Sequence, residues 1–179
     1  SLSILFNSLI ANKHLEEKIT SSILSEEEVA DDASPELLSI RRKIIQSGAK
    51  IREHLDKMLH SSSIQKCLQE SIITIRDGRY VLPVKAEHKN SVSGLVHDTS
   101  SSGATLFIEP LAVVETNNDI RILKGREQEE IERIISELSS ECGENADAII
   151  SDFETCAELN LYFSKSNLAA KMKASVPEL

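Results

Sequence analysis

The sequence predicts a mainly α-helical protein in which one small antiparallel β sheet is inserted between long helices. Apolar residues recur at three- and four-residue steps before residue 70 and after residue 110, the spacing of helices that bury one face. Residues 71–110 instead alternate with a period of two and contain most of the turn signals. Aromatic residues make up only 3% of the chain and Trp is absent, so the large core residues are Leu and Ile.

The amino-terminal part predicts one helix followed by an acidic loop. Residues 2–24 carry apolar side chains close to helical spacing, so we expect a single helix with one apolar face. These side chains are Leu2, Leu5, Phe6, Leu9, Ile10, Leu15, Ile19 and Ile23. Residues 25–33, SEEEVADDA, carry like charges that favour hydration, and we interpret them as a solvated connector.

A second, longer helix is predicted to start at Ser34. Ser34 can cap the helix, Pro35 suits its first turn, and Glu36 is stabilised near the positive helix end. The apolar residues that follow have a heptad pattern, which predicts packing against one partner helix. The heptad positions are Leu37, Ile44, Ile51 and Met58. We expect the helix to end or loosen at residues 61–63.

A basic face lies between the heptad positions of this helix. Its side chains are Arg41, Arg42, Lys43, Lys50, Arg52 and Lys57. We interpret the face as solvated, because that is the usual state of a charged helix surface. A contact with phosphate groups is the alternative that the sequence leaves open.

A β-hairpin is predicted around the Asp-Gly dipeptide at residues 77–78. Between two apolar runs this dipeptide favours a two-residue type I′ turn, which pairs Arg76 with Arg79. The register then places Ile73, Ile75, Tyr80, Leu82 and Val84 on one face and Arg76, Arg79 and Lys85 on the other. Two like charges opposite each other are unfavourable unless an anion lies over them. Pro83 has no amide hydrogen, so its amide side should lie at a sheet edge or a bulge.

Two further strands complete the predicted sheet. Residues 87–91 and 99–103 have the composition of turns, and residues 92–97 and 104–108 that of strands. The module therefore has about four antiparallel strands.

Two helices are predicted after the sheet. Glu109-Pro110 has the composition of a helix start, and residues 111–141 follow at helical spacing. Almost every residue between Lys124 and Arg133 is charged, so we expect that stretch to be exposed on most sides. Asn145 is predicted to cap a last helix that runs to about Met172.

Composition limits the classes of function. The net charge of −9 excludes an overall cationic attraction to nucleic acid, so such a contact needs a local basic patch. Three scattered cysteines, Cys67, Cys142 and Cys156, indicate a reducing compartment rather than disulfides or a zinc site. No apolar run has the length of a membrane span and no signal-peptide pattern is visible, so we expect a cytoplasmic protein. The chain does not begin with Met, and we expect it to be a piece of a longer protein.

The sequence predicts no catalytic or metal site. His97 and Asp98, followed by residues 100–102 (Ser-Ser-Ser), include the residue types of a hydrolase triad. Triads are usually assembled from distant segments, so we interpret Asp98 and the serines as turn residues that bond locally, and His97 as the end of a strand. Four other histidines share no metal-ligand spacing: His14, His54, His60 and His88. The glycines are isolated, so no phosphate-binding loop is visible. We therefore expect no enzyme activity and no cofactor in this chain.

The candidate binding surface is the β module. Between residues 71 and 97 four cations oppose two acids, which gives a net charge of +2, so the rest of the chain carries −11. A basic module on an acidic chain suits a phosphate backbone. The candidate nucleic-acid-binding residues are Arg76, Arg79, Lys85, His88 and Lys89. A solvated hairpin without a ligand would have the same pattern.

Two long motifs carry a family resemblance. They are similar to the middle region of the second bacterial MutS paralogue, and their sequences are IRDGRYVLPVKAEHK and GLVHDTSSSGATLFIEPLAVVETNNDIRIL. The resemblance extends to nearly the whole chain, because it includes SPELLSIRRKI before these motifs and CAELNLYFSKSNLAAKM after them. It implies a helical core with an outgoing lever in residues 1–69, a β-rich clamp in residues 70–109, and a returning lever with helical core in residues 110–179.

The resemblance also implies a function for the region. In such proteins a clamp closes on DNA and levers connect it to an ATPase. The longer protein from which this segment comes is expected to be a homodimer that uses ATP and Mg²⁺. It is also expected to carry an Smr-type endonuclease domain, and both catalytic domains would lie beyond residue 179. The chain would then be a non-catalytic region that binds duplex or branched DNA during DNA repair and suppression of homologous recombination. Rescue of stalled or collided ribosomes is one alternative, and a structural dimerisation or spacer module is another.

Overall fold

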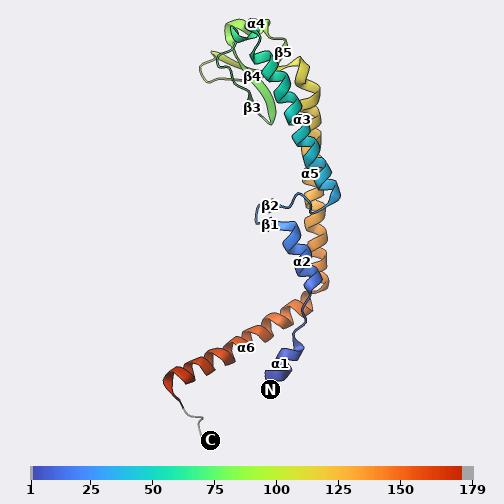
Figure 1. Ribbon diagram of the computed structural model, residues 1–179, viewed down its shortest axis with the longest axis vertical. Helices are drawn as coiled ribbons and strands as arrows, with labels where there is room; N and C mark the ends of the chain where they lie inside the picture. Colours follow the sequence, from blue (N-terminus) through green and yellow to red (C-terminus); the bar gives the residue numbers. More distant parts are fainter. Residues whose placement is uncertain (1, 175–179) are drawn as a thin grey trace. The chain divides into compact units, whose positions relative to one another are not determined.

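The computed structural model describes residues 2–174 and confirms long helices combined with a four-stranded antiparallel sheet (Figure 1). Residues 175–179, at the end of the predicted segment 110–179, lie outside the described residues. The chain forms two compact units. Unit 1 combines Ser1–Ala30 with Ile134–Leu179, and unit 2 is Asp31–Arg133. No helix within residues 2–174 has the length and apolar character needed to cross a membrane.

The amino-terminal part of unit 1 differs from the predicted single helix. Helix α1 (Leu2–Ser8) ends early, and α2 (Lys13–Ser22) begins anew. The cause is local, because the Asn12 side chain caps α2 by accepting a hydrogen bond from the Leu15 amide at 3.1 Å. The predicted solvated loop is also wrong in part: strands β1 (Ile23–Ser25) and β2 (Glu28–Val29) form a small hairpin. Burial of Val29 anchors this hairpin despite its acidic turn.

Two helices from the carboxyl-terminal part belong wholly or partly to unit 1. Helix α5 (Leu111–Glu144) runs three residues beyond the predicted end, and α6 (Ala146–Met172) follows after Asn145. Asn145 occupies the predicted cap position, but its side chain bonds elsewhere: it accepts from Asn12 Nδ2 at 2.8 Å and donates to the Glu141 carbonyl at 2.8 Å. Helix α6 buries only Leu159 among its described residues.

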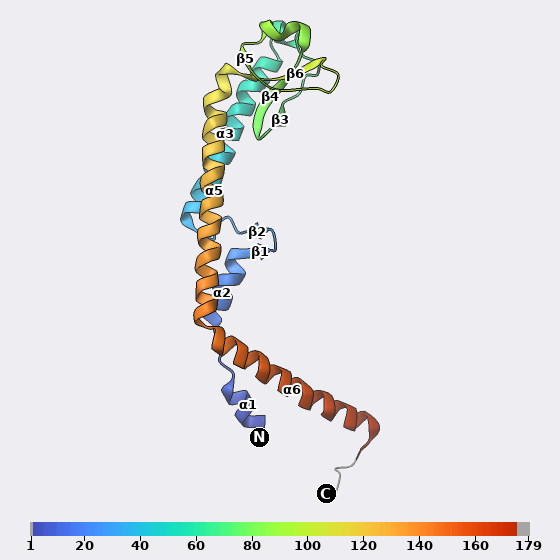
Figure 2. The same cartoon turned by 180° about the vertical axis from the view of Figure 1, so that it is seen from behind.

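Helix α3 (Pro35–Leu59) is the first long helix of unit 2. Ser34 caps it as predicted, because its hydroxyl oxygen accepts from the Leu37 amide at 2.9 Å. In both views α3 lies beside the first part of α5 (Figures 1 and 2). Arg41 donates to Glu127 at 2.8 Å, so an ion pair joins the two helices. Of the heptad positions, Leu37 and Ile51 are fully buried within the chain.

The sheet contains four strands in the spatial order β3-β4-β6-β5. Their bounds are β3 Thr74–Arg76, β4 Arg79–Lys85, β5 Gly94–Thr99 and β6 Thr105–Pro110. Helix α4 (Ser62–Gln65) precedes the sheet, and the 3₁₀ helix η1 (Ala86–Ser91) connects β4 to β5. Strands β5 and β6 end about two residues later than predicted. A register shift between Val96 and Asp98 lets β5 continue past His97.

The predicted hairpin register is confirmed. Arg76 pairs with Arg79, and Asp77 and Gly78 both have the positive φ angles, 47° and 75°, that a type I′ turn requires. Pro83 is an internal residue of β4, but its carbonyl accepts from the Gln69 amide at 2.9 Å. Its amide nitrogen lies on that same side of the strand, beyond the end of β3, so no ladder hydrogen bond is lost.

The core of unit 2 lies between α3 and one face of the sheet. Leu82, Val84 and Ile108 from the sheet pack against Ile51 and Leu55 from α3. The other face is also partly covered, because Val81 is fully buried. The face that was predicted to carry Arg76, Arg79 and Lys85 is therefore partly buried.

Candidate nucleic-acid interface

Arg79 is held by a buried carboxylate. Its Nη1 donates to both oxygens of Glu109, at 2.8 and 3.1 Å, and its Nη2 donates to Asn118 Oδ1 at 2.7 Å. The Glu109 side chain is completely buried, and 15% of the Arg79 side chain is exposed. Asn117 Nδ2 also donates to Glu109 at 2.7 Å, and His97 Nε2 lies against its other oxygen. A buried charge needs partners of this kind, so Arg79 is committed to the fold.

Asn117 ties this network to the backbone of β4. Its side-chain oxygen accepts from the Tyr80 amide at 3.1 Å, and its nitrogen donates to the Tyr80 carbonyl at 3.2 Å. The side chain thus replaces a neighbouring strand at the point where β6 ends. Sequence reasoning missed both Asn117 and Glu109. A signal was present, because Asn117 lies between the buried Val113 and Ile120 on the inward face of α5, where a polar residue needs a partner.

Arg76 remains accessible on the same face of the sheet. Its guanidinium lies 4.1 Å from the centre of the Phe107 ring, and its Nε is 3.4 Å from Asp98. The side chain is 43% exposed. Arg76 and Arg79 are cross-strand partners, but each has its own carboxylate, which relieves the repulsion expected from the sequence.

Lys85, His88 and Lys89 lie at the other end of β4. Six residues of strand separate Lys85 from Arg79, or about 20 Å at about 3.3 Å per residue. Lys85 Nζ donates a long hydrogen bond, 3.4 Å, to the Lys66 carbonyl just after α4. Lys89 and Lys66 are exposed, and His88 Nε2 is 3.6 Å from Glu87.

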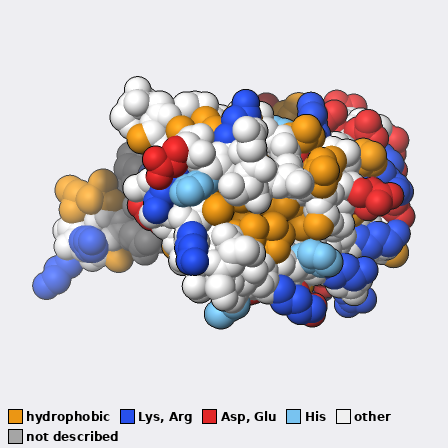
Figure 3. Space-filling model, turned by 90° about the horizontal axis from the view of Figure 1, so that it is seen from above, with side chains coloured by type: hydrophobic (Ala, Val, Ile, Leu, Met, Phe, Trp, Pro, Cys, Tyr) orange, Lys and Arg blue, Asp and Glu red, His pale blue; other side chains and the backbone are white. Residues whose placement is uncertain are grey.

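The structure therefore divides the candidate residues into two groups. Arg76 and Arg79 lie beside the hairpin turn, and the other three lie at the end of β4 and in η1. We call Lys66, Lys85, His88 and Lys89 the α4–η1 cluster. Lys66 was missed because it precedes the β module in sequence and only the fold brings it close. Figure 3 views the molecule from the end where Figure 1 draws α4, and shows Lys, Arg and His side chains around a central apolar patch.

Comparison with known proteins supplies the family. Two proteins described as Endonuclease MutS2 align with almost the entire chain. The relative from Caldanaerobacter subterraneus subsp. tengcongensis is 50% identical over 171 residues, which is 96% of this chain and 21% of the relative. The relative from Clostridioides difficile is 49% identical over 175 residues, which is 98% of this chain and 22% of the relative.

The chain corresponds to a segment of MutS2. The resemblance seen in the sequence is thereby confirmed, and the chain spans about a fifth of the length of these curated relatives. No protein-family model matches it.

The residues of the possible triad take part in hydrogen bonds of the sheet and its loop. His97 contacts Glu109, and Asp98 accepts from the Thr99 amide at 2.7 Å. Ser100 accepts from the Thr105 amide at 3.0 Å and thereby closes the loop between β5 and β6. In the described part of the chain, no group of His, Cys, Asp or Glu side chains could hold a metal ion.

Proposed function

We propose that this segment is a non-catalytic region that binds the phosphate backbone of nucleic acid through its sheet module. The observation that carries the proposal is the α4–η1 cluster. Within residues 2–174, its three lysines form no ion pair with a carboxylate, although the chain as a whole carries a net charge of −9. A phosphate that binds these ammonium groups displaces no protein carboxylate, so its binding free energy is not spent on breaking an ion pair.

Arg76 fits the same proposal as a flanking contact. Its guanidinium plane lies on Phe107, which fixes its direction while leaving donor groups accessible. Arg79 is assigned a structural role, because a phosphate could engage it only by displacing Glu109. By this proposal the sheet corresponds to a clamp within residues 70–109, with residues 1–69 and 110–179 as the helical parts on either side.

The long helices α3 and α5 supply a route by which ligand binding could affect a distant domain. Both run from the sheet module through unit 2, and polar contacts join the start of α3 to residues 126–130 of α5. In a longer MutS2-type protein, an ATPase that binds ATP and Mg²⁺ would lie outside this chain. The heptad residues Leu37 and Ile51 are already buried, so a homodimer would use another surface.

Charge reversal at the α4–η1 cluster tests the proposal. We expect Lys85→Glu/Lys89→Glu in the complete chain to bind a fluorescent mixed-sequence DNA duplex on the order of tenfold more weakly at about 0.1 M salt. The dependence of log affinity on log salt should also fall by about two units. The matched control is Lys165→Glu/Lys171→Glu on exposed positions of α6, which changes net charge equally. Equal affinity of the two variants would overturn the proposal.

The same cluster could engage DNA or ribosomal RNA, because both present phosphodiester groups. A competition assay with DNA duplex, RNA duplex and purified ribosomes separates these ligands. If ribosomes displace the DNA duplex preferentially, the ligand of this surface is the ribosome. If the DNA duplex stays bound preferentially, the ligand is DNA.

A further inference from the structure

A second basic surface lies on α3, outside the α4–η1 cluster. Residues 41–52 contain five cationic side chains and no acidic one, which makes this the most basic stretch of a chain with net charge −9. Arg41 is committed to Asp31 and Glu127. The other four are exposed, and none forms an ion pair with another described residue; they are Arg42, Lys43, Lys50 and Arg52.

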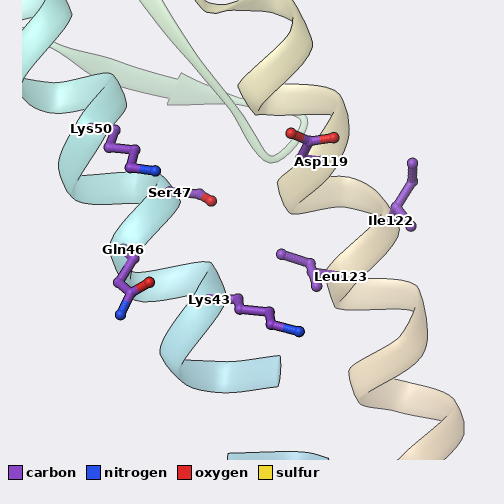
Figure 4. A pocket seen from close by; sticks show the side chains of 7 residues that line it. All are labelled: Lys43, Gln46, Ser47, Lys50, Asp119, Ile122 and Leu123. Atoms are coloured by element: carbon purple, nitrogen blue, oxygen red, sulfur yellow. The ribbon is translucent and has the colours of Figure 1, made fainter. Parts of the chain in front are cut away.

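Two of these lysines border a hollow between α3 and the first part of α5, which both lie within unit 2. The hollow has a volume of about 330 Å³, and Lys43, Gln46, Ser47 and Lys50 line it from α3. Asp119, Ile122 and Leu123 line it from α5. Figure 4 shows Lys43 and Ser47 directed from α3 toward the gap, with Leu123 directed toward it from α5.

The polarity of this hollow differs from the rest of the α3–α5 contact. Elsewhere the cations between these helices face carboxylates of the opposite helix: Arg41 faces Glu127, and Arg126 faces Glu36 at 2.6 Å. At the hollow, two lysines face a single acid, Asp119, which is not within ion-pair distance of either one. Exposed Arg121 and Lys124 on α5 add two further cations beside Ile122 and Leu123.

The spacing of the donors indicates an extended ligand. Lys43 and Lys50 are seven residues apart on one side of α3, or about 10 Å along the helix axis at about 1.5 Å per residue. A chain of phosphates could reach both, while the Ser47 hydroxyl and the Gln46 amide donate between them.

We propose that this α3–α5 groove binds the phosphodiester backbone of a nucleic acid and so forms a second contact besides the α4–η1 cluster. The inference rests on the proposed function for the identity of the ligand, and on its own residues for the location of the site. It makes α3 a binding element in addition to a connector between the sheet and the rest of the protein.

Charge reversal within the groove tests the inference. We expect Lys43→Glu/Lys50→Glu in the complete chain to bind the fluorescent DNA duplex on the order of tenfold more weakly at about 0.1 M salt. The log–log salt slope should fall by about two units. Lys43→Gln/Lys50→Gln, which removes charge without reversing it, should show a smaller loss in the same direction. Circular dichroism and thermal unfolding establish that both variants remain folded.

Two controls make the result decisive. Lys165→Glu/Lys171→Glu changes net charge by the same amount, so an equal loss in that variant, or no loss in the groove variant, overturns the inference. The cluster variant Lys85→Glu/Lys89→Glu separates the two sites. If the cluster variant binds the DNA duplex normally while the groove variant does not, the groove inference is supported and the proposed binding at the α4–η1 cluster is wrong. If both variants lose affinity and their combination loses more, both sites stand.

Discussion

At the scale of single residues, the nearest carboxylate decides what each cation can do. Arg79 lies against the fully buried Glu109 and therefore supports the fold. Arg76 reaches only the half-exposed Asp98 and keeps 43% of its side chain exposed. Lys85 and Lys89 have no carboxylate partner among residues 2–174 and are free to bind an external anion. The four cations therefore differ in role. Arg79 supports the fold, Arg76 is partly accessible, and the two lysines are available to bind an anion.

Neutralising Glu109 should destabilise unit 2. Glu109→Gln keeps the shape of the side chain but leaves Arg79 nearly buried without a countercharge, so we expect a loss of about 3–5 kcal/mol in the free energy of unfolding. Urea unfolding followed by circular dichroism measures the loss. Glu87→Gln is the matched control, because its side chain is 76% exposed and should change stability by less than about 0.5 kcal/mol. A Glu109 variant as stable as this control would contradict the structural role of the network.

Glu130 should make the stability of unit 2 depend on pH. Hydrogen bonds from Arg133 and from Ser34 lower the pKa of Glu130 from 4.5 to about 2. Because the folded-state pKa lies below the unfolded value, the carboxylate stabilises the fold above about pH 4.5 and loses that effect as pH falls toward 2. Glu130→Gln should therefore unfold at a lower temperature than the parent chain at pH 7, and the difference should shrink steadily below pH 4.5. A constant difference between pH 7 and pH 3 would contradict this assignment.

At the scale of elements, the features predicted from sequence are those fixed by local chemistry. The Ser34 cap and the Asp77-Gly78 turn each involve a few neighbouring residues, and both are confirmed. The missed features depend on distant partners. At Glu109 the sequence indicated only the start of a helix. Its partners Arg79 and His97 are distant in sequence and reach it only through the sheet.

The middle of α3 holds a glycine whose role is visible only in the folded chain. A Cβ atom at Gly48 would lie 3.1 Å from the Tyr80 hydroxyl oxygen, so Gly48 lets the ring approach the helix. Gly48→Ala gains about 1 kcal/mol of helix propensity but crowds this oxygen, and we expect little net change in stability. In a Tyr80→Phe background the crowding is absent, so the same substitution should stabilise by about 1 kcal/mol. Strictly additive effects in this double-mutant cycle would contradict the contact.

At the scale of the whole molecule, the cations proposed to bind anions and the exposed apolar side chains of α6 belong to different units. Within an acidic chain, the uncommitted cations concentrate at the α4–η1 cluster and along residues 41–52, both in unit 2. The helix α6 of unit 1 instead carries large exposed apolar side chains, including Phe153 at 75%, Met172 at 68% and Leu168 at 58%. Unit 2 thus carries the proposed anion-binding surfaces, and α6 of unit 1 carries exposed apolar side chains.

The exposure of α6 and the burial of the sheet core predict opposite results for apolar substitutions at the two places. Phe153→Ser/Met172→Ser should leave the unfolding free energy within about 0.5 kcal/mol, because neither side chain contributes much buried area in this chain. It should also lower the fluorescence of a hydrophobic dye bound to the native chain and reduce concentration-dependent association in analytical ultracentrifugation. Leu82→Ala in the buried sheet should instead cost about 2–5 kcal/mol. If the α6 variant loses stability comparably to Leu82→Ala, α6 must be packed within the isolated chain, because only buried apolar side chains contribute on that scale.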